Sequence, residues 1–152
     1  MKEIIIRQPC LQDEFEEMFD LRWRVLRKPW DQPKGSEKDE RDCKENGVHH
    51  FIAVVNEKIV GTARYHTCNE HEGQIRYLAV EEEYRGQNIG KNLLKHIERL
   101  SISLGIQYIK LNARKSARGL FEKLDYEMLA EGPKLFNEID HIVMGKPIIK
   151  IP

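Results

Sequence analysis

The sequence is short of cysteine, and it lacks both a cysteine pair and a long apolar run. Its 152 residues contain three cysteines in no CxxC arrangement, Cys10, Cys43 and Cys68, so neither a disulfide framework nor a cysteine-rich zinc module is expected. The apolar runs span only a few residues, which excludes a membrane-spanning helix and an apolar signal segment. We therefore expect a soluble, cytoplasmic protein that keeps its thiols reduced.

The chain also lacks an excess of either charge. Twenty-five lysines and arginines balance twenty-five aspartates and glutamates, so no net field attracts the protein to nucleic acid or to an anionic membrane. A chain of this length can bury about two-thirds of its unfolded surface, which is enough for one core. We expect a single domain over residues 1–152, with neither nucleic acid nor a membrane as its partner.

The apolar pattern predicts a series of strands and helices. β-Prone runs indicate strands at 3–7, 51–55, 58–66, 74–80, 108–112, 126–129 and 141–144. Apolar residues at helical spacing indicate helices at 12–27, 89–104 and 116–124. This order predicts an α/β fold with an α+β mixed sheet, helices on both faces and antiparallel pairing of the hairpin-linked strands. The strands on either side of the 89–104 helix should be parallel and joined by a right-handed crossover.

A long polar segment interrupts this pattern between residues 28 and 48. It holds eleven charged residues, two prolines and two glycines in twenty-one positions, which makes it too polar to pack as a core element and long for a simple connection. It is either a solvated excursion or a lid that faces a substrate. Arg64 and Arg76 fall in predicted strands, where a buried charge is costly, so we expect them to pair with acidic groups or to face a polar cleft.

The stretch from Tyr77 to Lys91 carries the strongest chemical signal. It passes from a strand through a polar turn into a helix, so backbone N–H groups without an intrahelical partner converge at the helix start. Gly86 and Gly90 keep side chains away from an approaching diphosphate, and Arg85 and Lys91 add positive charge. Lys91 in the first turn opposes the helix dipole unless an anion lies nearby. The pattern is neither GxGxxG nor a GK(S/T) loop, so a tight turn without a ligand and a site for another phosphorylated nucleotide stay open as alternatives.

This stretch resembles the cofactor loop of the GNAT superfamily of N-acetyltransferases. In that family an (R/Q)xxGx(G/A) loop after the fourth strand binds the pyrophosphate of acetyl-CoA, and residues 85–90 match it except that Asn88 replaces the middle glycine. Asparagine enters left-handed backbone conformations readily, so the loop can keep its shape. The resemblance implies a GNAT-like, mostly antiparallel central sheet and acetyl-CoA as cosubstrate. The cofactor-binding residues that it implies are Leu78, Ala79, Val80, Arg85, Gly86, Gln87, Asn88, Ile89, Gly90, Lys91, Asn112, Ala117 and Phe121.

A second match covers residues 111–126, where the family shows a pattern like LxAxxxAxxFYxKxGF. Asp125 replaces the usual glycine and also tolerates positive φ. Phe121 stands where many members carry a tyrosine thought to protonate the departing CoA thiolate, so the resemblance predicts a slower enzyme, a different acid or a water in that place. Residues 21–27 and 136–144 look like a bacterial ElaA-like branch of the family.

By this resemblance an amine attacks the acetyl thioester directly in a ternary complex, and backbone groups of residues 78–80 act as an oxyanion hole. An acceptor amine is mostly protonated at neutral pH and needs a base. The candidate bases are His66, Glu81 and His141, although each also has an ordinary reading as a strand residue, a solvated charge or a hydrogen-bonded histidine. The acceptor surface would come from the first helix, the 28–48 segment and a last loop at 132–140.

Two alternatives to an enzyme that needs no metal stay open. Loss of the tyrosine allows a CoA-binding sensor or interaction module that keeps the fold without catalysis. No CxxC or HExxH spacing supports zinc, so we predict no metal, although one group of side chains deserves weighing: His66, Cys68, Glu70, His71 and Glu72. The expected partners are acetyl-CoA and a primary amine of a small molecule or peptide, and edge strands allow a homodimer.

Overall fold

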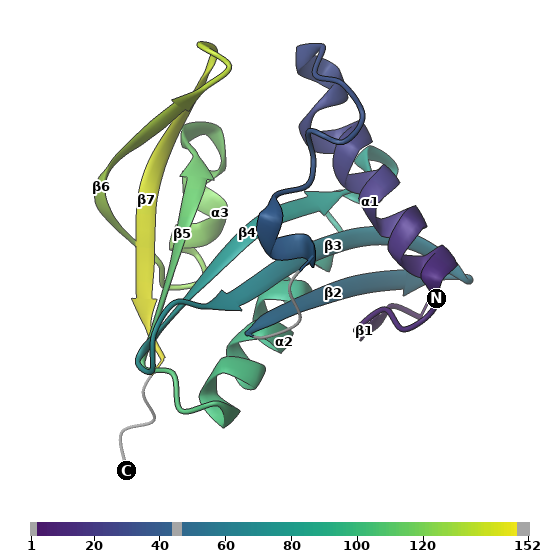
Figure 1. Ribbon diagram of the computed structural model, residues 1–152. Helices are drawn as coiled ribbons and strands as arrows, with labels where there is room; N and C mark the ends of the chain where they lie inside the picture. Colours follow the sequence, from purple (N-terminus) through teal and green to yellow (C-terminus); the bar gives the residue numbers. More distant parts are fainter. Residues whose placement is uncertain (1–2, 44–46, 149–152) are drawn as a thin grey trace. The chain divides into compact units, whose positions relative to one another are not determined.

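The computed structural model describes residues 3–43 and 47–148, which form the strands and helices labelled in Figure 1. The strands are β1 (Ile5–Arg7), β2 (Val48–Val55), β3 (Lys58–Thr67), β4 (Glu72–Val80), β5 (Tyr108–Arg114), β6 (Glu127–Leu135) and β7 (Ile139–Pro147). The α-helices are α1 (Gln12–Leu26), α2 (Ile89–Ser103) and α3 (Arg118–Glu122). Short 3-10 helices lie at η1 (Lys28–Trp30), η2 (Glu40–Cys43), η3 (Glu82–Tyr84) and η4 (Lys115–Ala117).

Hydrogen bonds join the strands in the order β1-β2-β3-β4-β5-β7-β6. The pairs β1/β2, β2/β3, β5/β7 and β6/β7 are antiparallel. β4 pairs parallel with β5, with Ile75 opposite Leu111. The predicted mixed, mostly antiparallel sheet is therefore confirmed, and so is the parallel pairing of the strands that flank α2.

The described residues fall into two compact units. One contains the residues up to 66 together with 77–97, and the other contains 67–76 together with the residues from 98 onward. β4 contributes its first five residues to the second unit and its last four to the first. None of the helices in 3–43 and 47–148 combines the length and apolar character that crossing a membrane requires.

In the first unit, α1 and α2 cover opposite faces of β2 and β3 (Figure 1). Met18 and Leu21 of α1 are fully buried in a cluster with Ile52 of β2, and burial of each of these side chains stabilises the fold by about 2 kcal/mol. On the other face, a Cβ at Gly61 of β3 would lie 2.9 Å from Ile89 Cγ2 of α2. The glycine allows the helix to approach the sheet this closely.

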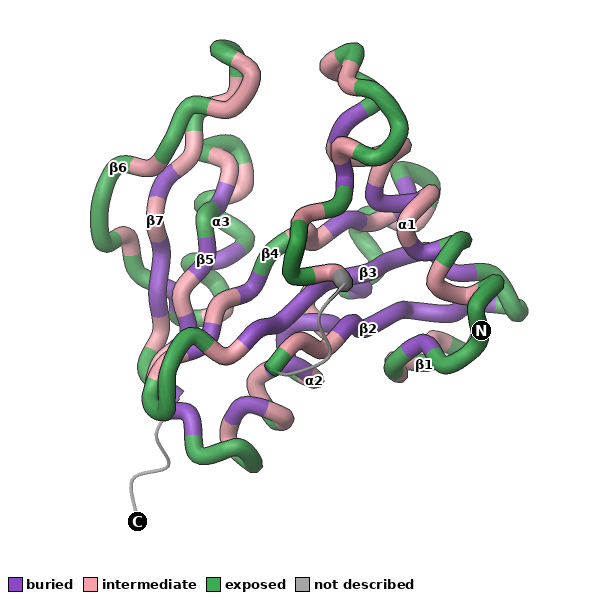
Figure 2. Tube along the Cα trace, in the orientation of Figure 1, coloured by how far each residue is buried: buried purple, intermediate pink, exposed green. Residues whose placement is uncertain are grey.

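β3 is buried along nearly its whole length, as the continuous purple tube in Figure 2 shows. The buried run includes polar side chains, namely Thr62, Arg64 and His66. Polar groups inside a buried strand need partners. Thr62 finds one in the Phe51 carbonyl, to which its hydroxyl donates at 2.8 Å, and the partners of Arg64 belong to the candidate site.

The core of the second unit is built around two aromatic rings. Phe121 of α3 and Tyr126 pack edge to face, with their centroids 6.0 Å apart. The Tyr126 hydroxyl donates to Glu98 at 3.0 Å, and Lys146 donates to the other oxygen of that carboxylate at 3.0 Å. Burial and the Glu98 charge raise the pKa of Tyr126 well above its ordinary value, so the phenol stays protonated.

The last elements of the second unit differ from the sequence prediction. The helix predicted at 116–124 is the 3-10 helix η4 followed by the five residues of α3. β6 and β7 are much longer than predicted, so most of the loop predicted at 132–140 is strand. Gly132 lies against β7, where a Cβ would be 2.9 Å from the His141 carbonyl oxygen. Pro133 fits because β6 is an edge strand and because its register with β7 is irregular between Glu131 and Lys134.

The left-handed positions predicted from the sequence are confirmed. Asn88 has φ +64° and Asp125 has φ +70°, so both replace glycine in the conformation that glycine would take. α2 ends at Ser103, and Gly105 follows with φ +79° as the expected stop signal.

Candidate functional site

The loop between β4 and α2 folds back on the strand that precedes it. After η3, Arg85 Nε donates to the Val80 carbonyl at 3.2 Å. The chain then turns through Gly86, whose φ is +82°, and through Asn88. The Asn88 carbonyl accepts the Asn92 N–H at 3.0 Å and so begins the hydrogen bonding of α2. The first N–H groups of α2 therefore point toward this loop.

The surface of this loop is open. Residues 85–88 are exposed, and Lys91 in the first turn of α2 is half-buried. A Cβ at Gly86 would meet no atom within 4 Å, and one at Gly90 would meet only Leu78 Cδ2, at 3.9 Å. Packing therefore does not require glycine at position 90. The arrangement leaves room, N–H donors and positive charge for an anion at the start of α2.

Residues 78–80 form the end of β4, directly before this loop. The middle residue is buried and the other two are half-buried. Tyr77 precedes them with φ +58°, a break in the extended geometry of the strand. On the other side, the Glu81 N–H donates to the Val60 carbonyl at 2.8 Å and fixes the strand end to β3. The stretch that the resemblance assigns to the acetyl group therefore lies between a left-handed residue and a backbone hydrogen bond to β3.

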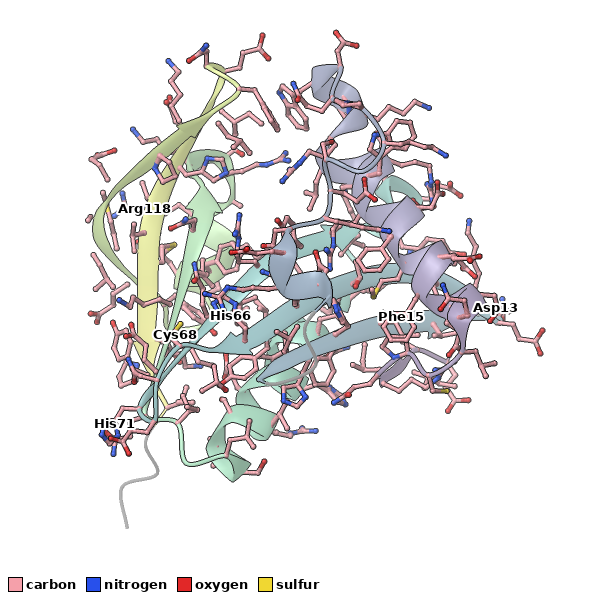
Figure 3. The ribbon with its side chains drawn as sticks, in the orientation of Figure 1. Asp13, Phe15, His66, Cys68, His71 and Arg118 are labelled. Carbon is pink, nitrogen blue, oxygen red and sulfur yellow. The ribbon has the colours of Figure 1, made fainter. Side chains whose placement is uncertain are left out.

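Two of the candidate bases lie in the first unit. Glu81 is buried, and both of its oxygens face cations: Arg24 Nη1 donates to Oε1 at 2.7 Å, and Lys58 Nζ lies 3.7 Å from Oε2. This carboxylate therefore bridges α1 and β3 rather than standing as a solvated charge. His66 is 3% exposed on β3 (Figure 3). It shares a sheet face with Arg64, which lies two residues earlier in the strand.

The third candidate base, His141, lies on β7 in the second unit. Its Nδ1 is 3.1 Å from the Ile139 carbonyl oxygen. Because a carbonyl only accepts hydrogen bonds, Nδ1 carries the proton and the lone pair of the neutral ring is on Nε2. This tautomer presents a basic nitrogen at the outer end of the ring.

The second unit also holds three residues that the resemblance assigns to the cofactor. Asn112 is exposed on β5, and Ala117 is half-buried at the end of η4. Phe121 is only 6% exposed and packs in the core of the unit.

The residues weighed as zinc ligands do not converge. Within 3–43 and 47–148, no three His, Cys, Asp or Glu side chains come together as a metal site. Cys68 and His71 are exposed in the turn between β3 and β4 (Figure 3). The Cys68 N–H donates to the Glu72 carbonyl at 2.8 Å, so this segment is a hydrogen-bonded polar turn.

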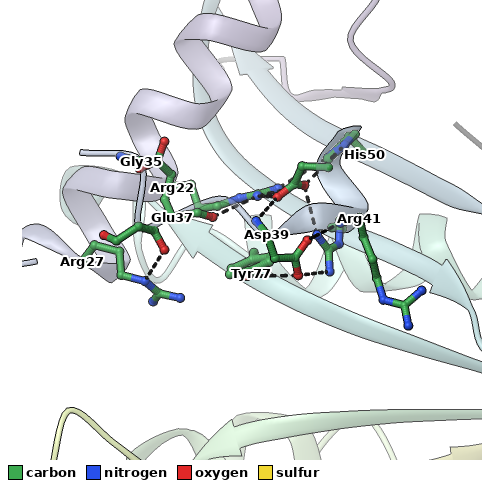
Figure 4. Close-up of polar contacts among 11 residues, drawn as sticks. Arg22, Arg27, Gly35, Glu37, Asp39, Arg41, His50 and Tyr77 are labelled. Carbon is green, nitrogen blue, oxygen red and sulfur yellow. Dashed lines mark hydrogen bonds and ion pairs between the residues drawn. The ribbon is translucent and has the colours of Figure 1, made fainter. Parts of the chain in front are cut away.

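A buried ionic network, made of Arg22, Asp39, Asp42 and Arg64, lies in the first unit. Figure 4 labels Arg22 and Asp39 of this network. Arg22 and Arg64 are 0% exposed, and the Asp42 side chain is 1% exposed. Asp42 accepts hydrogen bonds from Arg22 at 3.1 Å and from Arg64 at 3.0 Å. Arg64 also bonds both Asp39 oxygens, at 2.6 and 2.9 Å. Two guanidiniums and two carboxylates cancel each other's charge, and the expected pairing of Arg64 with acidic groups is confirmed.

The same region ties the polar 28–48 segment to α1. Arg22 donates to the Glu37 carbonyl at 3.2 Å, and Arg27 donates to the Ser36 carbonyl at 3.0 Å. The described part of this segment is therefore anchored rather than a solvated excursion, while residues 44–46 lie outside the described residues. Sequence reasoning missed the network as a unit, although Arg22 falls four residues after Met18 on the apolar face of α1 and thereby signals a buried charge.

His50 of β2 lies beside the network. Its Nδ1 is 3.4 Å from Arg22, its Nε2 is 3.7 Å from Asp42, and the Phe15 and Phe19 rings pack edge-on against it. Burial, together with the nearby Arg22 charge, lowers the pKa of His50 to about 4. The imidazole is therefore neutral at neutral pH, and the network keeps its charge balance.

Comparisons with known proteins agree with the sequence motifs. The model of the Acetyltransferase (GNAT) family matches residues 15–126. The acetyltransferase ECA0875 of Pectobacterium atrosepticum is 32% identical over 144 residues, which cover 91% of this chain and 92% of that protein.

Solved structures share the fold. An aminoglycoside 6'-N-acetyltransferase complexed with coenzyme A superposes with a TM-score of 0.82 at 19% identity, covering 97% of this chain and 99% of that one. The ribosomal-protein-S18-alanine N-acetyltransferase of Escherichia coli gives 0.79 at 20% identity, covering 99% and 97%. ElaA of Escherichia coli gives 0.80 at 18% identity, covering 96% and 99%. At these identities the likeness shows the fold alone.

Proposed function

This chain belongs to the acetyltransferase (GNAT) family, and we propose that it is an acetyl-CoA-dependent N-acetyltransferase whose acceptor is a primary amine of a small molecule or peptide. The open loop of residues 85–91 carries this proposal, because packing does not require the glycine at position 90, and the cation at position 91 lies in the first turn of α2, where it opposes the helix dipole unless an anion is nearby. When bound, acetyl-CoA supplies the activated acetyl thioester. The family and the coenzyme A complex of a protein with the same fold support it as the cosubstrate.

The loop fits the diphosphate of acetyl-CoA. Gly86 and Asn88 take left-handed conformations that turn the backbone into α2. N–H groups at the start of α2 would donate to phosphate oxygens, and the helix dipole favours negative charge there. The absence of a Cβ at Gly90 allows close approach, and Arg85 and Lys91 balance the charge.

Residues 78–80 support the transfer itself. Their backbone N–H groups would orient the acetyl carbonyl and stabilise the charge that develops on its oxygen. Positioning of two substrates in one complex would then supply much of the rate of direct attack by the amine. Among the candidate bases, His141 has a tautomer that suits proton removal, while both Glu81 oxygens face cations.

A second candidate function is a CoA-binding module without turnover. It is favoured by one observation: Phe121 is locked against Tyr126 and offers no proton to a departing thiolate. A thiolate with an ordinary pKa near 8.5 is nevertheless a tolerable leaving group, so the enzyme stays the leading proposal. Release of CoA thiol that depends on an added amine, in a screen of amino sugars, polyamines, amino acids and peptide N-termini, excludes the module.

Titration calorimetry tests the loop directly. We expect wild-type protein to bind acetyl-CoA and the Gly90→Glu variant to lose at least a hundredfold in affinity, because the new carboxylate occupies the diphosphate position with like charge. Ser103→Glu is the matched control, since it adds the same charge to the exposed far end of the same helix and should bind like wild type. Equal binding by wild type and Gly90→Glu would rule out the loop as the cofactor site.

A further inference from the structure

Tyr77 has an unusual backbone conformation inside β4. Its φ is +58°, and in the described part of the chain it is the one non-glycine strand residue with positive φ. A bulky side chain rarely takes this conformation, because its Cβ crowds the backbone. Such a residue persists only where the surrounding structure holds it in place.

The buried ionic network holds the Tyr77 side chain (Figure 4). The guanidinium carbons of Arg22 and Arg64 lie over its ring, 4.3 and 4.8 Å from the centroid. Both distances are within the range of cation–π attraction, which is stronger where the cation is buried. The Tyr77 hydroxyl donates to Asp39 Oδ2 at 3.3 Å. The ring is therefore held both at its face and at its tip.

The network makes these contacts rigid. Neither arginine can move away without leaving a buried charge uncompensated, because Asp42 is shared between them. Arg64 is further fixed by two parallel bonds to Asp39, a geometry that restricts the guanidinium in its plane. In this way α1, β3 and the segment next to η2 all act on one residue of β4.

We propose that Tyr77 is a positioning residue for acetyl transfer: the buried ionic network fixes its ring, and the ring fixes the backbone of residues 78–80 that receives the acetyl group. This inference rests on the proposed function. Tyr77 holds the start of that stretch, and the bond from the Glu81 N–H to the Val60 carbonyl holds its end. The loop at 85–91 acts instead on the diphosphate, so a change at Tyr77 separates recognition of the acetyl group from recognition of the rest of the cofactor.

Titration calorimetry with CoA and with acetyl-CoA tests this separation. For Tyr77→Leu, which removes ring and hydroxyl, we expect the Kd of CoA to change less than twofold and the Kd of acetyl-CoA to rise at least fivefold. Tyr77→Phe keeps the ring between the arginines and should restore acetyl-CoA binding to within about twofold of wild type. Tyr65→Leu is the matched control, because Tyr65 is a buried tyrosine on the neighbouring strand and faces away from Arg64. It should leave the ratio of the two Kd values unchanged.

The outcomes distinguish this inference from the proposed function. Parallel weakening of both ligands by Tyr77→Leu, or no weakening of either, means that Tyr77 has only a structural role and overturns the inference. If Tyr77→Leu does not fold, Asp39→Asn decides instead: it removes the charge that fixes Arg64 over the Tyr77 ring. Selective weakening of acetyl-CoA binding then supports the inference, and an unchanged ratio of the two Kd values overturns it. Wild-type protein that binds neither ligand refutes the proposed function, and the inference falls with it.

Discussion

Asp42 is the residue whose loss should damage the first unit most. Its carboxylate is 1% exposed and lies 3.1 and 3.0 Å from two guanidiniums that are themselves fully buried. Asp42→Asn keeps the shape and removes the charge, so Asp39, which bonds Arg64 and is 25% exposed, would be the one carboxylate of the network left to balance two guanidiniums. Removing one partner from a buried ion pair costs about 3–5 kcal/mol. Because the asparagine oxygen still accepts hydrogen bonds, we expect a loss near the lower limit, about 3 kcal/mol.

A loss of this size is readily measured. Domains of this kind are stable by about 5–15 kcal/mol, so Asp42→Asn should remove a fifth or more of the free energy of unfolding. With roughly 2–4 °C per kcal/mol for a chain of 150 residues or more, Tm should fall by about 6–12 °C. Urea unfolding followed by tryptophan fluorescence gives the free energy independently, because Trp23 lies on α1 and donates its ring N–H to Gln32 in the anchored segment.

Glu40→Gln provides the control for this prediction. Glu40 lies two residues before Asp42 in η2 and is exposed, so the same change of charge there should alter stability by no more than about 0.5 kcal/mol. A loss below about 1 kcal/mol for Asp42→Asn, or equal losses for the two variants, would show that the network contributes little and that the packing around it holds the segment.

Two further measurements test the histidines. Because burial lowers the pKa of His50 to about 4, the unfolded chain binds a proton between pH 6.5 and 4 while the folded chain does not. Stability should therefore fall by up to about 3 kcal/mol as the pH drops through that window. His50→Gln should flatten this part of the stability curve, and an unchanged slope contradicts the assignment. For the candidate base His141, the His141→Gln variant should lower kcat for thiol release by about 10²–10⁴ and leave the Kd of acetyl-CoA within twofold. If His66→Gln has that effect instead, the base is on β3.

The elements that sequence reasoning predicted well are those set by local chemistry. The helical apolar stripe from residue 89 onward ends at a glycine with positive φ, and both the stripe and the stop are visible in a short window of sequence. Asn88 could be predicted as left-handed for the same reason, since its side chain tolerates that region whatever the rest of the fold does. The conformation of the loop before α2 was therefore the part of the candidate site that could be predicted most completely from the sequence.

The long hairpin of β6 and β7 could not be predicted from a short window of sequence, because it depends on pairing between strands. Gly132 and Pro133 indicate a loop by their own preferences. Both residues nevertheless lie in β6, because β6 pairs with β7 along this stretch. The pairing has two irregularities of register, and a short window of sequence does not reveal it. Tertiary pairing outweighs residue preference here, and only the hydrogen-bond register reveals it. The same is true of Tyr77, because no property of a tyrosine predicts positive φ in a strand.

The buried ionic network could in principle have been predicted from the sequence, but its residues come from three separate segments: a helix, a strand and the polar 28–48 segment. Two arginines interrupt apolar patterns, one in a helix and one in a strand, and each requires a carboxylate. The 28–48 segment contains six acidic residues. If the whole segment is taken to be solvated, nothing distinguishes the acids that pair with these arginines from the others. Asp39 and Asp42 differ from the others in their spacing of three, and the Asp42 N–H donates to the Asp39 carbonyl at 3.1 Å at the start of η2. In a 3-10 turn, residues three apart lie on the same side. Two carboxylates at that spacing can therefore pair with two buried arginines. These ion pairs anchor the described part of the 28–48 segment to the first unit, although its composition suggests a solvated segment.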